Sequence, residues 1–90
     1  MLEAVKLSMG ITVSAYDAEI QDLISAALAD LGIAGVDNTL TQDPLIIQAV
    51  KTYCRAHFRS PADYDRLRAA YDEQKAQLMT ASGYTDWGDA

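Results

Sequence analysis

The sequence predicts an all-α fold, a compact bundle of four helices. Apolar residues recur at helical spacings of three and four in four separate segments. Glycines and the pairs Asp43-Pro44 and Ser60-Pro61 provide stop and start signals between those segments. We find no internal repeat and no low-complexity tract. We expect helices at about 2–9, 15–31, 44–58 and 61–80, a long loop at 33–42, and a helical domain 1–82 followed by a flexible tail 83–90.

The first two segments have recognisable ends. Residues 2–9 form a short amphipathic helix, and Gly10 ends it. In the second segment we expect Ser14 to accept a hydrogen bond from the backbone N–H of Asp17. A broad apolar stripe follows, and Gly32 supplies the left-handed stop. The stripe contains Tyr16, Ile20, Leu23, Ile24, Ala27, Leu28 and Leu31.

The third helix should be the central one. Asp43 caps it and Pro44 takes its first position. Residues 33–42, which precede it, have no helical period and form a loop, with a short extended piece around 33–36. Apolar residues occur on most sides of the third helix, which favours deep burial. They are Leu45, Ile46, Ile47, Ala49, Val50, Tyr53, Cys54, Ala56 and Phe58, and His57 lies on the same stripe.

Ser60-Pro61 opens the fourth helix, with Asp63 as a capping-box partner. This helix has a narrow coiled-coil-like seam beside many charged residues. The seam contains Tyr64, Leu67, Tyr71, Gln74 and Leu78. Ser82-Gly83 ends the helix.

Size and composition narrow the class of protein. A chain of 90 residues, half of them hydrophobic and 22% charged, is too apolar for a disordered acidic tail. A domain of this size buries little core, which favours packing against copies of itself or a partner.

No apolar run approaches the roughly 18 residues of a membrane span, and residues 1–10 do not resemble a signal peptide. The single cysteine excludes an intramolecular disulfide and a cysteine-based zinc site, and fits a reducing compartment, the cytoplasm.

Catalytic and metal sites find little support in the sequence. Cys54 and His57 lie three residues apart, a spacing at which a nucleophile could meet its base. Both fall on the apolar stripe, however, where a packing role is commoner. The acids Asp17, Glu19 and Asp22 match no EF-hand, and the dipole at a helix start accounts for them. We therefore expect no enzyme, no catalytic residue, no metal and no cofactor.

Charge is unevenly distributed along the chain. Residues 1–43 hold seven acids and one base, whereas residues 44–75 hold six bases and four acids. Lys51, Arg55 and Arg59 follow one another at intervals of four. This pattern fits a solvated face with intramolecular pairs to the acidic second helix. It also fits a contact between the acidic side of one subunit (Asp17, Glu19 and Asp22) and the basic side of the next, which closes into a ring.

The basic residues are a weak indication of DNA binding, because the net charge is −6 and no DNA-reading motif accompanies them. The C-terminal segment holds Tyr84 and Trp87 among Gly, Thr and Asp. Such aromatics either fold back on the domain or anchor a partner.

Three segments, in this order, resemble the small head–tail connector (head-completion or adaptor) proteins of long-tailed double-stranded DNA phages. They are ITVSAYDAEIQDLISAALADLGI, DPLIIQAVKTYCRAHF and YDRLRAAYDEQKAQL, followed by the terminal SGY. The departures from the pattern are Cys54 and His57. The resemblance implies a virion protein, made in the host cytoplasm, that forms a homo-oligomeric ring beneath the portal.

That ring would be dodecameric, extend the DNA channel without binding DNA specifically, and meet the next connector or tail-completion protein. The resemblance also places partner docking in the C-terminal part, for which Leu78, Tyr84 and Trp87 are the candidates. No membrane contact is expected. The alternative hypothesis is a small helical adaptor or regulator that binds one soluble protein through the seam formed by Tyr64, Leu67 and Tyr71.

Overall fold

A computed structural model describes residues 1–37, 39–59 and 61–80. It has four helices, α1 (Leu2–Met9), α2 (Asp17–Ile33), α3 (Pro44–His57) and α4 (Tyr64–Thr80). The predicted all-α bundle is confirmed. Ser60, Ser82-Gly83 and the predicted tail 83–90 lie outside the described residues. Within the described part of the chain, no helix is both long and apolar enough to cross a membrane.

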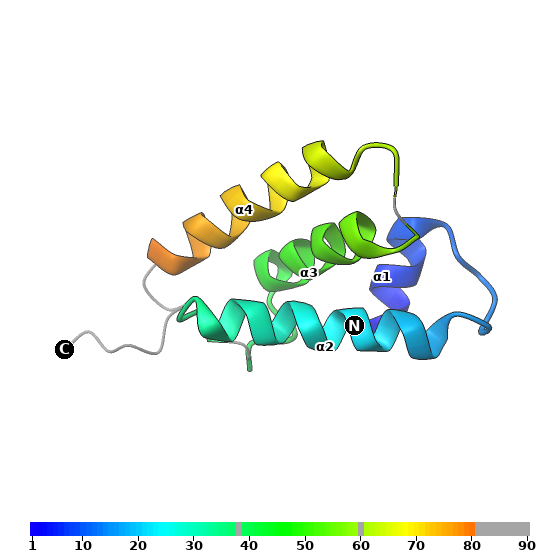
Figure 1. Cartoon of the computed structure of the whole chain (residues 1–90). Coiled ribbons are helices and arrows are strands. Elements are labelled where there is room, and N and C mark those ends of the chain that lie inside the picture. The colour runs from blue at the N-terminus through cyan, green and yellow to red at the C-terminus, as the bar shows by residue number, and fades with distance from the viewer. Residues whose placement is uncertain (38, 60, 81–90) are drawn as a thin grey trace.

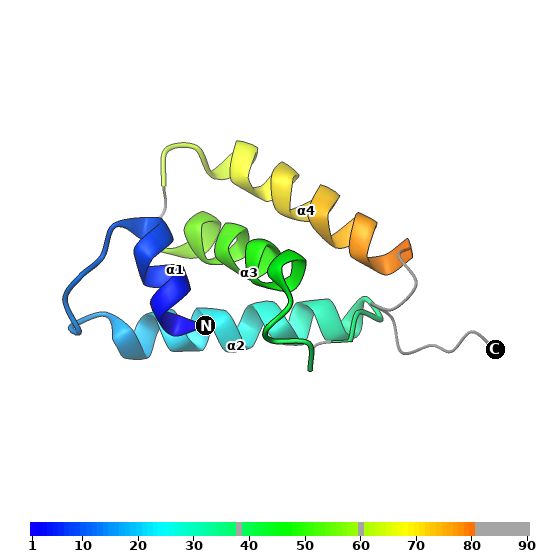
Figure 2. The same cartoon turned by 180° about the vertical axis from the view of Figure 1, so that it is seen from behind.

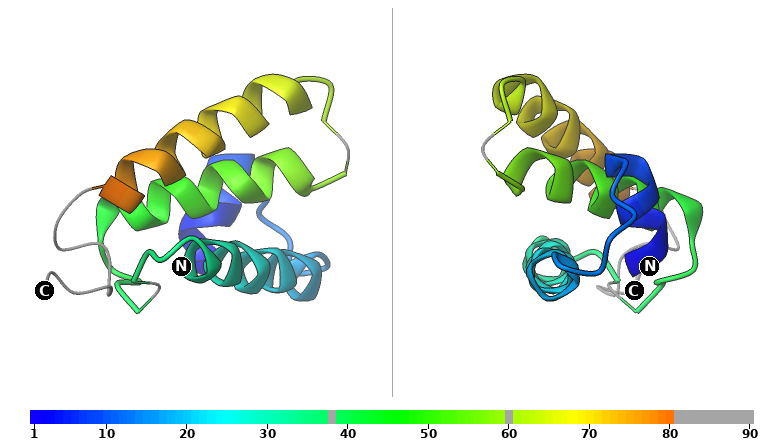
Figure 3. Two further views of the ribbon diagram at one scale, coloured as in Figure 1. Left: turned by 60° about the vertical axis from the view of Figure 1, so that its left-hand side comes forward. Right: turned by 90° about the vertical axis from the view of Figure 1, so that its right-hand side faces the viewer.

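Helix α3 is the centre of the bundle, as predicted. It lies between α2 and α4 and runs antiparallel to both (Figure 1). Seen from behind, α1 crosses the end of the bundle where α3 finishes (Figure 2). Figure 3 gives two further views of this arrangement. Helix α3 packs against each of the other three helices. The last turns of α2 and α4 and the first turn of α3 therefore share one end of the molecule (Figure 1).

The core takes residues from all four helices and from the loop after α2. Ile20, Leu31, Ile46 and Val50 are fully buried, in agreement with the predicted stripes. Because burial of such side chains is the main favourable term in folding, this cluster holds the helices together. Its members are Val5, Ile20, Ile24, Ala27, Leu31, Val36, Ile46, Ala49, Val50, Cys54, Tyr71 and Leu78.

The start of α2 differs from the prediction. The helix begins at Asp17, and its N-cap residue is Tyr16, whose side chain makes no capping hydrogen bond. The N–H of Asp17 donates to the backbone oxygen of Ser14 at 3.1 Å. The predicted bond to the Ser14 side chain is thus wrong, because a backbone turn supplies the acceptor instead.

The end of α2 also differs. The helix continues through Gly32 to Ile33, and Gly35 has the left-handed conformation, with φ 93°. The N–H of Gly35 donates to Gly32 at 3.0 Å and that of Val36 to Leu31 at 2.9 Å, which is the Schellman motif. This stop places Val36 in the core, 2% exposed. The extended piece predicted around 33–36 is wrong for residues 33–35, which helix and turn occupy, and only Val36 has extended, bridge-type backbone.

Two other helix ends behave as predicted. Gly10 ends α1 with φ 71°, and its N–H donates to Leu7. Asp43 caps α3, where its carboxylate accepts from the N–H of Leu45 at 2.9 Å, and Pro44 takes the first helical position.

Helix α4 starts at Tyr64 rather than at residue 61. Pro61 belongs to a preceding turn in which its carbonyl accepts from the N–H of Tyr64 at 3.3 Å. The Asp63 side chain forms an ion pair with Arg66 at 2.6 Å, and its predicted capping-box partner, Ser60, lies outside the described residues.

Candidate subunit and partner interfaces

The acidic residues at the start of α2 lie in two environments. Asp17 forms an ion pair of 2.7 Å with Lys6 of α1, whose side chain is only 9% exposed. Glu19 accepts from Arg59 at 3.1 Å. Asp22 lies on the opposite, exposed side of α2 from Ile20, and no ion pair of Asp22 occurs among the described residues. Two of the three acids are thus paired within the subunit, and Asp22 faces outward.

The predicted line of cations is divided as well. Lys51 and Arg55 lie on α3, but Arg59 comes two residues after the end of that helix. Arg59 has φ 61°, a conformation that is costly for a residue with a Cβ. Its guanidinium carbon lies 4.8 Å from the centre of the Tyr16 ring and 5.2 Å from that of Phe58. Arg59 therefore joins the start of α2 to the end of α3.

Lys51 and Arg55 are the two cations of the predicted line that lie on α3 itself. Neither forms an ion pair within the part of the chain that the structure describes. Arg55 is exposed and lines a shallow hollow beside Met9, Phe58 and Leu67. Asp22 on α2 and these two cations on α3 thus form two separate patches of opposite charge.

The outward face of α2 is made of small residues. Ala18, Ser25, Ala26 and Ala29 are exposed on the side away from the core. Ile33 ends this face and is 88% exposed. A neighbouring backbone can approach such a face closely. The sequence analysis missed it because it followed only the apolar stripe of this helix.

Cys54 and His57 do not form a catalytic pair. Cys54 is fully buried, and its burial raises the pKa of the thiol to about 12, which keeps it protonated and unreactive. His57 is exposed, contrary to the predicted stripe. Cys54 and Ala56 in the same last turn of α3 are buried, so His57 lies on the side of this turn that the other helices leave open. The imidazole stacks 4.3 Å from the Tyr53 ring and meets the edge of Tyr64 at 5.8 Å.

The seam of α4 is occupied within the chain. Leu67, Tyr71 and Leu78 are buried where α4 packs on α3. The alternative adaptor hypothesis needed this seam as a free binding surface. Of the three residues named for it, only Tyr64 is exposed, at 36%.

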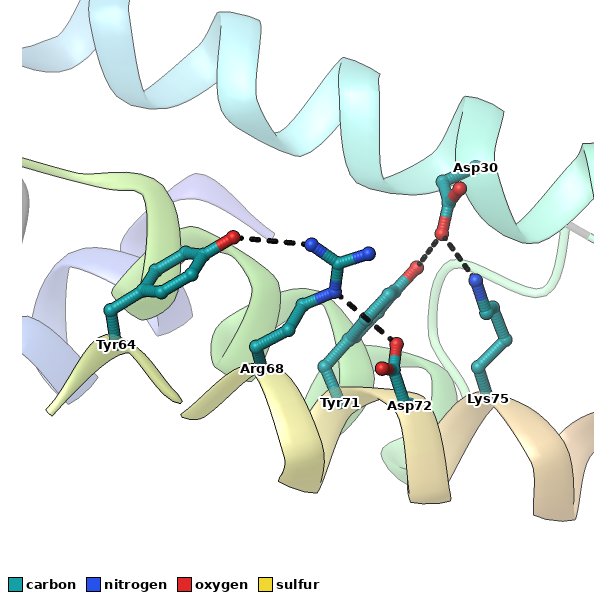
Figure 4. Close-up of polar contacts among 6 residues, drawn as sticks. All are labelled: Asp30, Tyr64, Arg68, Tyr71, Asp72 and Lys75. Atoms are coloured by element: carbon teal, nitrogen blue, oxygen red, sulfur yellow. Dashed lines mark hydrogen bonds and ion pairs between the residues drawn. The ribbon is translucent and has the colours of Figure 1, made fainter. Parts of the chain in front are cut away.

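A polar cluster that sequence analysis missed links α2 to α4 (Figure 4). The Tyr71 hydroxyl donates to the Asp30 carboxylate at 2.6 Å, and Lys75 donates to the same oxygen at 3.1 Å. Partial burial alone raises the pKa of Asp30, but the hydrogen bonds from Tyr71 and Lys75 outweigh it and hold that pKa below 3.8. Burial and the bond to Asp30 both raise the pKa of Tyr71.

On the same face of α4, Arg68 makes two further contacts at the exposed surface (Figure 4). Arg68 donates to the Tyr64 hydroxyl at 3.1 Å and to Asp72 at 3.4 Å. The i, i+4 spacing of these residues is the signal that could have indicated them. Nothing in the sequence signals the approach of Asp30.

One candidate for partner docking, Leu78, lies near the C-terminal end of α4. Leu78 is 3% exposed and belongs to the core, yet it also lines a groove with Leu45, Gln48, Gln74 and Gln77. Tyr84 and Trp87 lie outside the described residues. The structure thus describes the surroundings of one of the three candidates, Leu78, at the end of the bundle where α3 begins and α4 finishes.

Comparison with known proteins agrees with the resemblance drawn from the sequence. Neither the curated proteins nor the solved structures gave a match. A protein-family model described as phage connector protein matches residues 1–85, nearly the whole chain. With its four-helix fold, this chain belongs to the phage connector protein family.

Proposed function

We propose that this protein is a structural subunit of the phage neck, which forms a ring between portal and tail, extends the DNA channel and joins head to tail. The observation that carries the proposal is the connector family match over residues 1–85. Connectors are structural virion proteins, and the buried, protonated Cys54 agrees with a role without catalysis.

The ring is built from one contact repeated around an axis. Asp22 of one subunit lies against Lys51 and Arg55 of the next, and Asp17, Glu19 and Arg59 flank this contact while they retain their partners within the subunit. Support comes from the position of the two patches on different helices, because a contact between unlike patches generates a ring when the rotation between subunits closes. The small residues on the outward face of α2 allow close approach. We take the ring on the virion to be dodecameric.

The channel and the docking surface follow from charge and position. With a net charge of −6 per subunit, an acidic channel wall repels the phosphate backbone, so DNA slides through without specific binding. The end of α4 and the segment after it, with Leu78, Tyr84 and Trp87, dock onto the portal. The opposite side of the ring receives the next connector or tail-completion protein.

Charge reversal tests the contact. Lys51→Glu with Arg55→Glu should prevent ring formation on the portal, as seen by electron microscopy and by co-purification with the portal protein. Asp22→Lys alone should do the same, and a mixture of the two variants should recover assembly in part, because the reversed charges again attract. Arg59 is left unchanged, since its reversal would also break the pair with Glu19.

The control is Arg66→Glu with Arg68→Glu, which reverses the same number of charges on α4, although it also breaks the exposed ion pairs with Asp63 and Asp72. It should leave assembly intact, and far-UV circular dichroism checks that it folds. If the Lys51 and Arg55 variant assembles like the wild type, the proposed contact is wrong. If the wild-type protein never co-purifies with portal or virions of its phage, the neck function itself is wrong.

A further inference from the structure

A groove of about 240 Å³ lies between the first turns of α3 and the last turns of α4. Leu45 and Leu78 provide apolar surface, and Gln48, Gln74 and Gln77 complete the lining. Leu45 is 57% exposed although it begins the central helix. An apolar side chain placed here would cover surface that the four helices leave in contact with water.

Gln74, one of the lining residues, also has an acceptor without a donor. The side-chain oxygen of Gln74 is buried and has no hydrogen-bond partner within the described residues. A buried acceptor left unpaired costs about 1–3 kcal/mol. The occupant that suits this groove is therefore an apolar group that carries an N–H donor.

We propose that this occupant is the C-terminal segment of the same chain, residues 81–90, with the indole of Trp87 in the groove and its N–H donating to Gln74. Indole combines a large apolar surface with a single N–H that only donates. Trp87 is the only tryptophan of the chain. No other residue of this segment offers both properties to the same degree.

The distances allow this contact. The segment starts directly after Thr80, the last residue of α4. Gln74 lies about 9 Å back along the helix from Thr80, at 1.5 Å per residue. The seven residues from Thr80 to Trp87 can span up to roughly 23 Å, so the chain can reverse and reach the groove. A short tether also gives an effective concentration on the order of millimolar, which favours the chain's own segment over that of another copy.

The proposal concerns the free subunit and does not depend on ring formation. It adds one consequence to the function proposed above. Trp87 has to leave the groove before it can dock onto the portal. The same side chain would therefore contact the groove in the free subunit and the portal in the assembled neck.

Because Trp87 is the only tryptophan, its fluorescence reports on this contact alone. The experiment uses the full chain and measures the emission maximum and acrylamide quenching. Leu45→Glu places a charge in the groove at an exposed position, so the fold should survive, which far-UV circular dichroism checks. Leu7→Glu is the matched control, since Leu7 is 83% exposed on α1 and does not line the groove.

In the wild type and in Leu7→Glu, we expect emission at shorter wavelength than in the chain unfolded by guanidinium, and quenching reduced severalfold. Leu45→Glu should shift emission to longer wavelength and remove the protection. Quenching in the wild type equal to that of the unfolded chain would overturn the proposal. Protection that persists in Leu45→Glu would place Trp87 elsewhere, and protection lost on dilution would assign the groove to the segment of a second copy.

Discussion

The hydrogen bond from Tyr71 of α4 to Asp30 of α2 gives the most specific prediction about stability. Tyr71→Phe removes the hydroxyl that donates to Asp30 at 2.6 Å and leaves the ring in the core. A hydrogen bond to a charged group contributes about 1.5–3 kcal/mol. The Asp30 side chain is 36% exposed and keeps Lys75 as a partner, so water and the ammonium group replace part of the loss. We therefore expect the free energy of unfolding to fall by about 1.5 kcal/mol.

Urea and thermal unfolding, followed by circular dichroism, measure this effect. For a domain of this size, the loss corresponds to a Tm lower by roughly 6–12 °C. The control is Tyr64→Phe, because the Tyr64 hydroxyl accepts a hydrogen bond from Arg68 at the exposed surface. Its effect should stay within about 0.5 kcal/mol. Equal stability of wild type and Tyr71→Phe would refute the inference that the hydrogen bond between Tyr71 of α4 and Asp30 of α2 stabilises the fold.

Acid dependence provides a second measurement on the same variant. The folded-state pKa of Asp30 lies below its ordinary value of 3.8. The carboxylate thus stabilises the fold above pH 3.8, and this contribution is lost as the pH falls through the folded-state pKa. The difference between wild type and Tyr71→Phe should be constant near neutral pH and shrink below pH 3.8. A difference that grows in acid would contradict the assignment.

Two further predictions concern single positions. Gly10→Ala should lower the free energy of unfolding by about 1 kcal/mol. The cause is the backbone, because Gly10 has φ 71° while an added Cβ would meet nothing within 4 Å. Urea unfolding measures this loss, and an unchanged stability would mean that the turn accepts alanine without strain. Cys54 should react with a thiol reagent at pH 8 only as fast as the chain opens, because the thiol is fully buried. Labelling of the folded protein as fast as of the unfolded chain would show that the thiol is accessible.

The helices themselves could be predicted from the sequence, because the signals that form them are local. Apolar spacing placed the core positions of α2 and α3, and Asp43-Pro44 marked the start of α3 correctly. Gly10 was predicted as a stop for the same reason: a left-handed residue directly after a short helix needs no information from elsewhere in the chain.

The errors arose where tertiary packing decides. Gly32 and Gly35 are both plausible stops, and Gly35 is used because this choice brings Val36 into the core. His57 continues the stripe of α3 in sequence, but the neighbouring helices bury Cys54 and Ala56 in the last turn and leave His57 exposed. Burial there depends on the arrangement of other elements, which helical periodicity does not contain.

The candidate interfaces could be predicted only in part for a related reason. The sequence identifies Asp17, Glu19 and Arg59 as charged, but it does not tell that Lys6 and Tyr16 lie beside them in the same subunit. Asp30 and Tyr71 are 41 residues apart, and no spacing rule relates them. Long-range pairs of this kind follow from the fold and have to be read from it.

The connectivity of the bundle has a consequence for how the chain reaches its native state. Among the strongly packed helix pairs, α1 with α2, α2 with α3 and α3 with α4 are consecutive along the chain, and only α1 with α3 skips an element. Proteins dominated by such local contacts fold in microseconds to milliseconds. Each newly synthesised polypeptide should therefore fold quickly, so the folding step itself should not delay the appearance of native subunits.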